Sequence, residues 1–410
     1  MSGPLRILIS AGEVSGDLYA AQLVEALNRE AEAEGPLDLK AVAGEQTRRA
    51  GAAIIGDTTS RAALGFVAPL RFLAPALATA SRILRLIRRW QPHVVVLLDY
   101  PGFNIPLSGM IRRFSSVPLI YYLPPEECIW SLKGAGRVNR TPLVVNNCDC
   151  LLTTHEVDTA FYSAAGATVE RVGHPLVDLV DQHPRPYHDT GVKRSATLAL
   201  LPASRHQELG LLWPCLSQTA ALMARARPEL EFLVPLATRH LRPAMARACE
   251  TAQLQYPELA GRLRLVEPTP DHPNAALAAA WQAGAALSKS GSVTLELALA
   301  DVPHLMALRI DRVTEWLGRH MLRLSEGDFP HMALPNFILG RDLVPEFKQH
   351  AIDPARMAAT ALELLDLDSP ARTAQLAGFA DLRASLGGAG AARRAARIIL
   401  ESARRHAAAM

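Results

Sequence analysis

Short apolar runs recur along the chain, and most are followed by a polar turn and a stretch with helical periodicity. An apolar run of about four to eight residues between turn signals is typical of a buried strand in a parallel sheet. In the first half strand patterns, most of them apolar, occupy residues 6–10, 39–42, 94–98, 118–122, 151–154 and 169–172. In the second half they occupy residues 197–201, 231–235, 263–266, 283–287 and 303–308. The alternation of strands and helices predicts an α/β fold with parallel sheets.

A polar stretch without periodicity, residues 182–191, separates the two halves and is typical of a linker. We therefore expect two doubly wound, Rossmann-like domains that face one another across a cleft, at residues 1–182 and 192–370. The remaining residues, 371–410, have a helical pattern rich in Ala and Arg. We expect these C-terminal helices to cross back and pack on the first domain.

Residues 64–75 are apolar on every face, and a helix expected at 78–90 follows them. Its exposed side should carry Arg82, Arg85, Arg88 and Arg89. An apolar segment beside an arginine-rich helix is typical of a protein that dips into an anionic membrane surface. The expected membrane contacts are Phe66, Val67, Leu70, Phe72 and Leu73. The alternative is a core hairpin that the arginines solvate.

Composition narrows the class of protein. The 410 residues are 49% hydrophobic and 20% charged, as in a globular protein with an ample core, and the net charge of +3 gives no indication of nucleic-acid binding. The 5 cysteines form no CxxC pair, so we expect reduced thiols. With no signal-peptide pattern and no long apolar run, the sequence predicts a cytoplasmic protein.

The stretch 287–300 contains the turn best suited to an anion. Gly291 follows an apolar run, Ser290 and Ser292 are good helix N-caps, and a helical pattern follows. A helix N-terminus presents N–H groups and positive potential to an anion such as a diphosphate. Glu296, one turn further on, could hold a ribose diol. An ordinary strand-to-helix turn is the alternative.

Other strand ends also carry polar residues. Asp99 ends the most apolar strand, where burial could raise its pKa and make it a general base, unless it only caps a turn. Arg205 stands at a helix start, where it could contact phosphate. Glu13 and Asp17 place acidic side chains at another helix start. They could interact with the helix dipole or bind an acceptor substrate. With neither a Walker A sequence nor a dinucleotide fingerprint, these features suggest a nucleotide-sugar transferase.

Six blocks of the sequence resemble the lipid-A-disaccharide synthase family, in the family's order: residues 11–17, 99–104, 173–175, 201–205, 290–296, and 334–336 with 344–346. The resemblance implies a GT-B fold and an inverting transferase without a tightly bound metal or other cofactor. Its members join UDP-2,3-diacylglucosamine to 2,3-diacylglucosamine 1-phosphate, giving a β-1,6-linked disaccharide and UDP. They are bacterial enzymes that work at the inner face of the cytoplasmic membrane. A homodimer is left open.

The resemblance also implies roles for single residues. Asp99 matches the family's proposed catalytic aspartate, with His174 as the competing base because an unperturbed histidine titrates near neutrality. The acceptor side is expected to include Glu13, Ser15, Asn104 and His174. The donor side is expected to include Arg205, Ser290, Gly291, Ser292, Glu296 and the polar residue Asn336.

Three departures from the family pattern lie in the acceptor half. Gly102 stands where a second acid is usual, Thr47 where Met is usual, and residues 124–131 replace a Trp-rich block before Arg137. They leave open a transferase for a different acyl-sugar or glycolipid, or a non-catalytic homologue that binds lipid or nucleotide. A UDP-sugar epimerase shares the two-domain plan, but it gives no reason for the apolar and arginine-rich segment.

Overall fold

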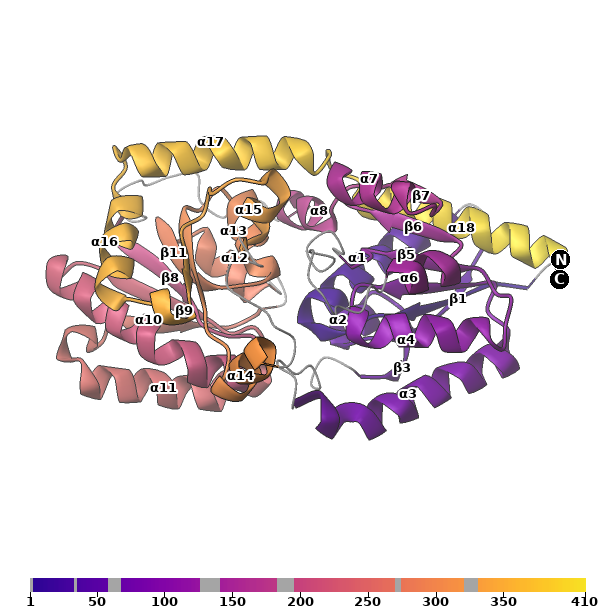
Figure 1. The fold of residues 1–410 in the computed structure, drawn as a ribbon, viewed down its shortest axis with the longest axis horizontal. Coiled ribbons are helices and arrows are strands. Elements are labelled where there is room, and N and C mark those ends of the chain that lie inside the picture. Colours follow the sequence, from indigo (N-terminus) through magenta and orange to yellow (C-terminus); the bar gives the residue numbers. More distant parts are fainter. Residues whose placement is uncertain are drawn as a thin grey trace. The chain divides into compact units, whose positions relative to one another are not determined.

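The chain folds into two compact units, each with one parallel sheet between helices (Figure 1). The computed structural model describes residues 3–32, 35–57, 68–125, 141–182, 195–269, 274–320 and 331–410. One unit comprises Met1–Leu179 with Leu386–Met410, and the other comprises Val180–Ser385. The first boundary lies within three residues of the expected one at 182.

The first unit contains a parallel sheet with the strand order β3-β2-β1-β4-β5-β6-β7. Its strands are β1 (Leu5–Ser10), β2 (Leu37–Val42), β3 (Ala53–Gly56), β4 (Val94–Leu98), β5 (Leu119–Tyr122), β6 (Cys150–Thr153) and β7 (Val169–Arg171). Every strand expected in this half is present, with ends shifted by at most two residues. The edge strand β3 was not predicted, because its apolar run is only three residues long before Gly56.

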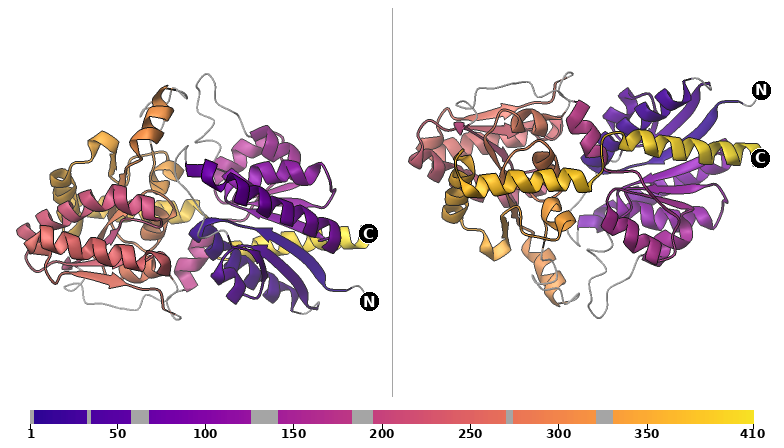
Figure 2. Two further views of the ribbon diagram at one scale, coloured as in Figure 1. Left: turned by 90° about the horizontal axis from the view of Figure 1, so that it is seen from below. Right: turned by 90° about the horizontal axis from the view of Figure 1, so that it is seen from above.

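Helices cover both faces of this first sheet. They are α1 (Glu13–Ala31), α2 (Glu45–Arg49), α3 (Ala68–Trp90), α4 (Pro101–Arg112), α6 (Thr141–Asn147), α7 (Glu156–Ala164), α8 (Pro175–Gln182) and α18 (Ala391–Ala409). On one face, buried residues of β1 and β4 pack against α3, α4 and α6. On the other face α18 lies against α1, β1 and β4 (Figure 2).

The second unit contains a parallel sheet with the order β10-β9-β8-β11-β12-β13. Its strands are β8 (Thr197–Leu201), β9 (Glu231–Pro235), β10 (Leu263–Val266), β11 (Ala285–Lys289), β12 (His304–Leu308) and β13 (Glu346–Lys348). The edge strand β13 is not among the predicted strands, although Glu346 and Phe347 pair with β12. An edge strand of three residues is too short to show a pattern.

The helices of the second unit again lie on two faces. They are α10 (His206–Ala226), α11 (Arg242–Gln255), α12 (Ala275–Ala280), α13 (Ser292–Leu299), α14 (Arg312–His320), α15 (Leu334–Leu339), α16 (Pro354–Leu365) and α17 (Pro370–Ser385), with 3-10 helices η1 (Arg239–Leu241), η2 (Pro257–Leu259) and η4 (Gln349–Ala351). Residues of α10, α11 and α16 form one core with β8, β9 and β11. The helices α13, α15 and α17 contact one another.

The C-terminal helices divide between the units. The prediction that residues 371–410 all pack on the first domain is wrong for α17, which belongs to the second unit. There Phe379 and Leu382 are buried, and Gln375 bonds both main-chain groups of His304. The return to the first unit is confirmed for α18, which buries Ala395, Ile399 and other small or apolar residues.

The described part of α3 is a helix of the first core. It begins ten residues before the expected start at 78 and continues through Pro75. Ile83 and Ile87 are buried in the core, while Arg82, Arg85, Arg88 and Arg89 are exposed as expected. Phe66 and Val67 lie outside the described residues, as do the side chains of Leu70, Phe72 and Leu73.

No described helix combines the length and the apolar character needed to cross a bilayer.

His304, at the start of β12, is a buried histidine with a displaced pKa. Its Nδ1 lies 2.9 Å from the Val302 carbonyl oxygen, so Nδ1 carries the proton, and its ring stacks on Phe379. Burial lowers the pKa of His304 to about 4. The unfolded chain therefore binds the proton more tightly than the folded protein does.

We predict that the second unit loses stability as pH falls through the unfolded pKa of His304 towards its folded value. Its contribution is on the order of 2 kcal/mol between about pH 7 and pH 5. In His304→Phe, the free energy of unfolding measured with urea should fall less over this pH window, whatever its absolute value. His350→Ala, which removes an exposed histidine, is the control and should keep the wild-type slope. An unchanged slope in His304→Phe would contradict the assignment.

Candidate active site

The carboxyl end of β4 forms a strained turn that presents Asp99. Asp99 and Tyr100 have φ of 46° and 54°, in the left-handed region that residues other than glycine rarely occupy. Each such residue costs on the order of 1–3 kcal/mol, so the surroundings must hold it. The Asp99 amide donates to the Tyr122 carbonyl oxygen over 3.0 Å, and α4 begins directly after Tyr100.

Asn104 fixes this turn through hydrogen bonds to its main chain. Its Nδ2 lies 3.1, 3.2 and 2.8 Å from the carbonyl oxygens of Ser10, Leu98 and Asp99. Its Oδ1 accepts from the Ser10 hydroxyl over 2.7 Å, and the side chain is fully buried. Protein groups occupy both polar atoms of Asn104, so it supports the turn, and its contact with the acceptor stays a prediction.

The Asp99 carboxyl is the group in the first unit best suited to act as a base. Burial and, to a smaller extent, the charge of Glu13 raise the pKa of Asp99, a hydrogen bond from the Tyr100 amide opposes them, and the resulting pKa is about 7. The residue nevertheless keeps part of its surface exposed. A carboxyl with this pKa accepts a proton efficiently near neutral pH.

The neighbouring end of β1 approaches the same turn. A Cβ on Gly12 would lie 2.3 Å from two ring carbons of Tyr100, so only glycine fits there. The Tyr100 ring also stacks on Phe103 at 5.6 Å between centroids. Glu13 follows with a φ of 63°, and Ser15 is partly exposed on the first turn of α1. The structure thus groups Glu13 and Asp99 at adjacent strand ends.

Asp17 has a structural task. Its carboxylate accepts from the amides of Gly44, Gln46 and Thr47 and from the Thr47 hydroxyl, at 2.6–3.1 Å. It thereby caps α2, and the reading of Asp17 as an acceptor ligand is wrong. Thr47, one of the departures from the family pattern, supplies a hydrogen bond to this cap.

His174 is a poor base in this structure. Burial lowers the pKa of His174 to about 3, with a smaller contribution from His155. Its Nδ1 accepts from the Leu176 amide over 3.1 Å, and Tyr19 packs edge-on against the ring. Its own amide donates to the Leu386 carbonyl oxygen, so His174 lies where the chain re-enters the first unit.

In the second unit the turn after β11 has the expected shape. Gly291 has a φ of 118° and is itself the N-cap of α13, so neither Ser290 nor Ser292 caps the helix. The Ser290 hydroxyl donates to the Met332 carbonyl oxygen over 2.9 Å instead. Thr294 bonds the Gly291 carbonyl oxygen and accepts from the Leu334 amide, which fixes the following loop on the helix start.

Glu296 is almost buried behind this turn. Its Oε2 accepts from Asn274 Nδ2 over 2.8 Å, and Asn274 in turn caps α12. Burial raises the pKa of Glu296, against hydrogen bonds from Asn274 and Ser292 and the charge of Lys289. Only a small part of the side chain, 7%, remains exposed for a ligand.

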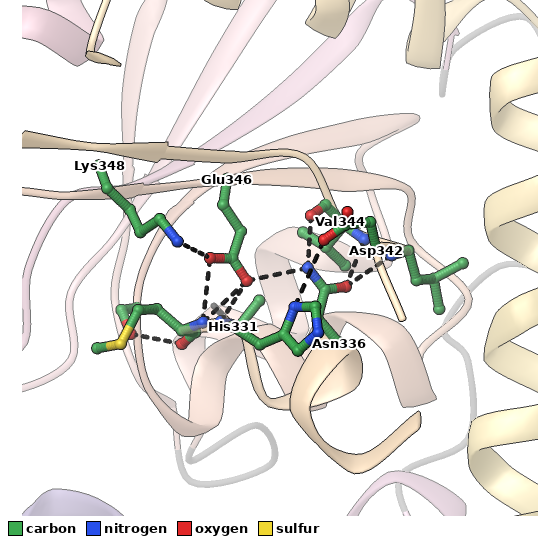
Figure 3. A network of polar contacts seen from close by, with 10 residues as sticks. His331, Asn336, Asp342, Val344, Glu346 and Lys348 are labelled. Atoms are coloured by element: carbon green, nitrogen blue, oxygen red, sulfur yellow. Dashed lines mark hydrogen bonds and ion pairs between the residues drawn. The ribbon is translucent and has the colours of Figure 1, made fainter. Parts of the chain in front are cut away.

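Asn336 lies in a saturated polar network (Figure 3). Its Oδ1 accepts from the amides of Leu343 and Val344, and its Nδ2 donates to the Val344 carbonyl oxygen and to Glu346, at 2.7–2.9 Å. Glu346 also accepts from the amides of Met332 and Ala333. Protein groups take every hydrogen-bonding position of the Asn336 amide, so Asn336 holds this loop, and its contact with the donor stays a prediction.

The sequence analysis assigned no role to four residues of the second unit: Glu208, Asn274, Lys289 and Glu346. Glu208 accepts from Ser204 and pairs with Arg205 and Lys289, while Asn274 and Glu346 hold the elements described above. Glu208 stands three residues after the N-cap of α10, but that cap is Arg205 and not Ser or Thr, so the capping-box pattern does not reveal it. The contacts of Lys289, Asn274 and Glu346 join distant segments, so no local signal could reveal them.

Among the described residues, no group of three or more His, Cys, Asp or Glu side chains could hold a metal ion.

A model of the lipid-A-disaccharide synthetase family matches residues 7–385. The chain belongs to this family. Lipid-A-disaccharide synthase of Prochlorococcus marinus (strain MIT 9313) is 36% identical over 97% of this chain and 99% of its own length. The enzyme of that name from Myxococcus xanthus (strain DK1622) is 32% identical over 98% of each chain.

Solved structures share the fold of this family member at low sequence identity. UDP-GlcNAc 2-epimerase from Neisseria meningitidis, bound to UDP-GlcNAc, has a TM-score of 0.65 at 12% identity and covers 97% of this chain and 100% of its own. The glycotransferase of kitacinnamycin has a TM-score of 0.60 at 15% identity, covering 97% and 99%. The two parallel sheets are thus those of the GT-B fold, as expected from the sequence.

We predict that Asn336→Ala lowers the free energy of unfolding by about 2–4 kcal/mol. The substitution removes hydrogen bonds from buried main-chain groups and from the Glu346 carboxylate. Chemical denaturation measures the loss. Asp342→Ala is the matched control from the same network, since Asp342 is 92% exposed and pairs only with His331 among the described residues. Unchanged stability together with lost UDP affinity would instead make Asn336 a ligand.

Proposed function

We propose that this protein catalyses inverting glycosyl transfer from UDP-2,3-diacylglucosamine to 2,3-diacylglucosamine 1-phosphate. The products are lipid A disaccharide 1-phosphate and UDP. Membership of the family supports the reaction, and the Asp99 turn is the observation on this chain that carries it. A buried carboxyl with a pKa of about 7 on a strained strand-end turn has the properties of a general base.

The proposed reaction is a single displacement. The Asp99 carboxylate takes the proton of the acceptor's 6-hydroxyl while that oxygen forms a bond to the anomeric carbon of the donor. The bond from this carbon to the diphosphate breaks on the opposite face, and its electron pair leaves with UDP. The configuration inverts, which gives the β-linkage. His174 fits the base role less well, because burial lowers its pKa to about 3.

We assign the donor to the second unit and the acceptor to the first. The donor groups would be the Ser290, Gly291 and Ser292 turn with Glu296 behind it and Arg205 after β8. The glycine φ of 118° and the helix N-terminus of α13 support an anion at this turn. Glu13 and Ser15, on the first turn of α1 close to the Asp99 turn, would face the acceptor.

We also propose that the protein associates peripherally with the inner face of the cytoplasmic membrane. The substrates carry acyl chains, and the exposed arginines of α3 suit an anionic surface. Ala80, Ile83 and Ile87 of α3 are part of the core, so this later part of the helix does not insert. The contact would fall on residues 64–77.

We predict that Asp99→Asn lowers turnover by ~10²–10⁴-fold with UDP binding intact, since general-base catalysis is worth that much. Asn tolerates the left-handed backbone, so the turn should survive. Wild-type kcat/KM should fall about tenfold per pH unit below about pH 7, where Asp99 is protonated. In Glu13→Gln this acid limb should move to lower pH, because a repelling charge is removed.

The rival base gives the opposite result. If Asp99→Asn keeps near-wild-type turnover while His174→Gln loses it, His174 is the base. An acid limb that does not move in Glu13→Gln would show that the carboxyl titrating in the profile is not Asp99.

We predict that Glu296→Ala weakens UDP binding by about 1–3 kcal/mol through loss of a charged hydrogen bond to ribose. Calorimetry with UDP and with 2′,3′-dideoxy-UDP separates this contact from a folding effect, since the variant should no longer distinguish the two ligands. The control Glu363→Ala removes an exposed carboxylate of the same unit and should leave UDP binding unchanged. If Glu296→Ala binds UDP as the wild type does, the ribose assignment fails.

We predict that replacing Phe66, Val67, Leu70, Phe72 and Leu73 with Ser moves the protein from anionic vesicles to the soluble fraction. Co-sedimentation with vesicles measures this. The matched control is Val313→Ser with Trp316→Ser, which removes exposed apolar side chains of α14. Equal sedimentation of all three proteins would leave the core-packing explanation for the apolar segment.

A further inference from the structure

A buried carboxylate of the second unit holds two cations next to the turn that starts α13. Glu208, in the first turn of α10, is 6% exposed. Its Oε2 accepts from the Ser204 amide and hydroxyl over 2.7 and 3.0 Å. Its Oε1 lies 3.3 Å from Arg205 Nη1 and 3.5 Å from Lys289 Nζ. One oxygen is thus used by the helix start and the other by the two cations.

The topology of the sheet brings the two cations together. β8 and β11 are parallel neighbours, with Leu201 opposite Ser288. Arg205 and Lys289 therefore follow the carboxyl ends of adjacent strands, where α/β folds bind ligands. A Cβ on Gly291 would lie 3.5 Å from Lys289 Nζ, so the ammonium lies close beside the turn.

Lys289 interacts with two acids at this cluster. Two cations share the Glu208 carboxylate at a helix N-terminus, and the nearby Glu296 carboxyl, whose pKa burial raises, is the other acid that interacts with Lys289. Lys289 is 17% exposed, and in the described part of the chain its Nζ reaches Glu208 and, over 3.2 Å, the Ser290 carbonyl oxygen. An ammonium has three N–H donors, so one remains for a further acceptor.

We propose that Lys289 is a second cationic ligand of the donor's diphosphate, beside Arg205, and that Glu208 is a positioning residue that aims both cations at it. The inference rests on the proposed function, because it takes the nucleoside diphosphate sugar as the ligand of this turn. Negative charge grows on the diphosphate oxygen as the bond to the anomeric carbon breaks. An ammonium held at that oxygen stabilises the leaving group.

The first test compares ligands that differ in phosphate number. Lys289→Met should weaken UDP and inorganic pyrophosphate about 10- to 100-fold, the effect of losing a charged hydrogen bond, and leave uridine unchanged. Lys289→Arg should restore most of the UDP affinity. The matched control is Arg242→Met, which removes an exposed, ion-paired cation of the same unit and should not change any of these affinities.

The second test separates positioning from folding. Glu208→Gln should weaken UDP about tenfold in the wild-type background and much less in Lys289→Met, because its effect passes through the cations. If Glu208 only stabilised the fold, Glu208→Gln would lower the uridine affinity and the melting temperature, and each loss would be equal in the two backgrounds. That result would overturn its positioning role.

The outcomes for the two proposals differ. If the wild type turns over the UDP-sugar and Lys289→Met binds UDP as tightly, the inference fails and the proposed function stands. If the wild type binds pyrophosphate in a Lys289-dependent way but neither binds UDP nor turns over the sugar, the proposed function fails and the anion site stands. If neither ligand binds the wild type, both are wrong.

Discussion

Buried side-chain amides that saturate main-chain groups at strand ends are the interaction on which both units depend. Asn104 joins the ends of β1 and β4 by bonding Ser10, Leu98 and Asp99. Asn336 does the same for the loop that closes over the start of α13. Each unmade bond of this kind would leave a buried polar group at a cost of about 1–3 kcal/mol. The turns with unusual backbone angles can therefore persist.

Carboxyl groups of the chain differ in task because they differ in partners. Asp17 accepts from the amides at the start of α2, and Asp178 accepts from the amides of Gly390 and Ala392 at the start of α18. Both serve the fold. Asp99 instead lies near Glu13 at the ends of two adjacent strands, and its pKa is raised to about 7. Burial alone does not separate a cap from a base; the neighbouring donors and charges do.

The sequence was sufficient for the succession of strands and helices along each half and for the presence of turns at Asp99 and Gly291, because apolar runs and strand-end residues are local signals. It was insufficient for Asn104, Asn336 and Asp17, since an amide or acid after a strand can equally bind a ligand or hold a distant main chain. The prediction that α17 packs on the first unit was wrong for a related reason. Helical periodicity shows that a face is buried, and it does not show which sheet covers it.

The return of α18 makes the first unit discontinuous in the chain, with the second unit inserted between its parts. Because synthesis runs from the N-terminus, α18 is made after the whole second unit, although it covers α1 and β1 of the first. The second unit can complete its core while the first still exposes apolar surface, and domains generally fold as they emerge. The sheet that carries the Asp99 turn would thus be completed late, and a growing chain would hold a finished second unit before a finished first unit.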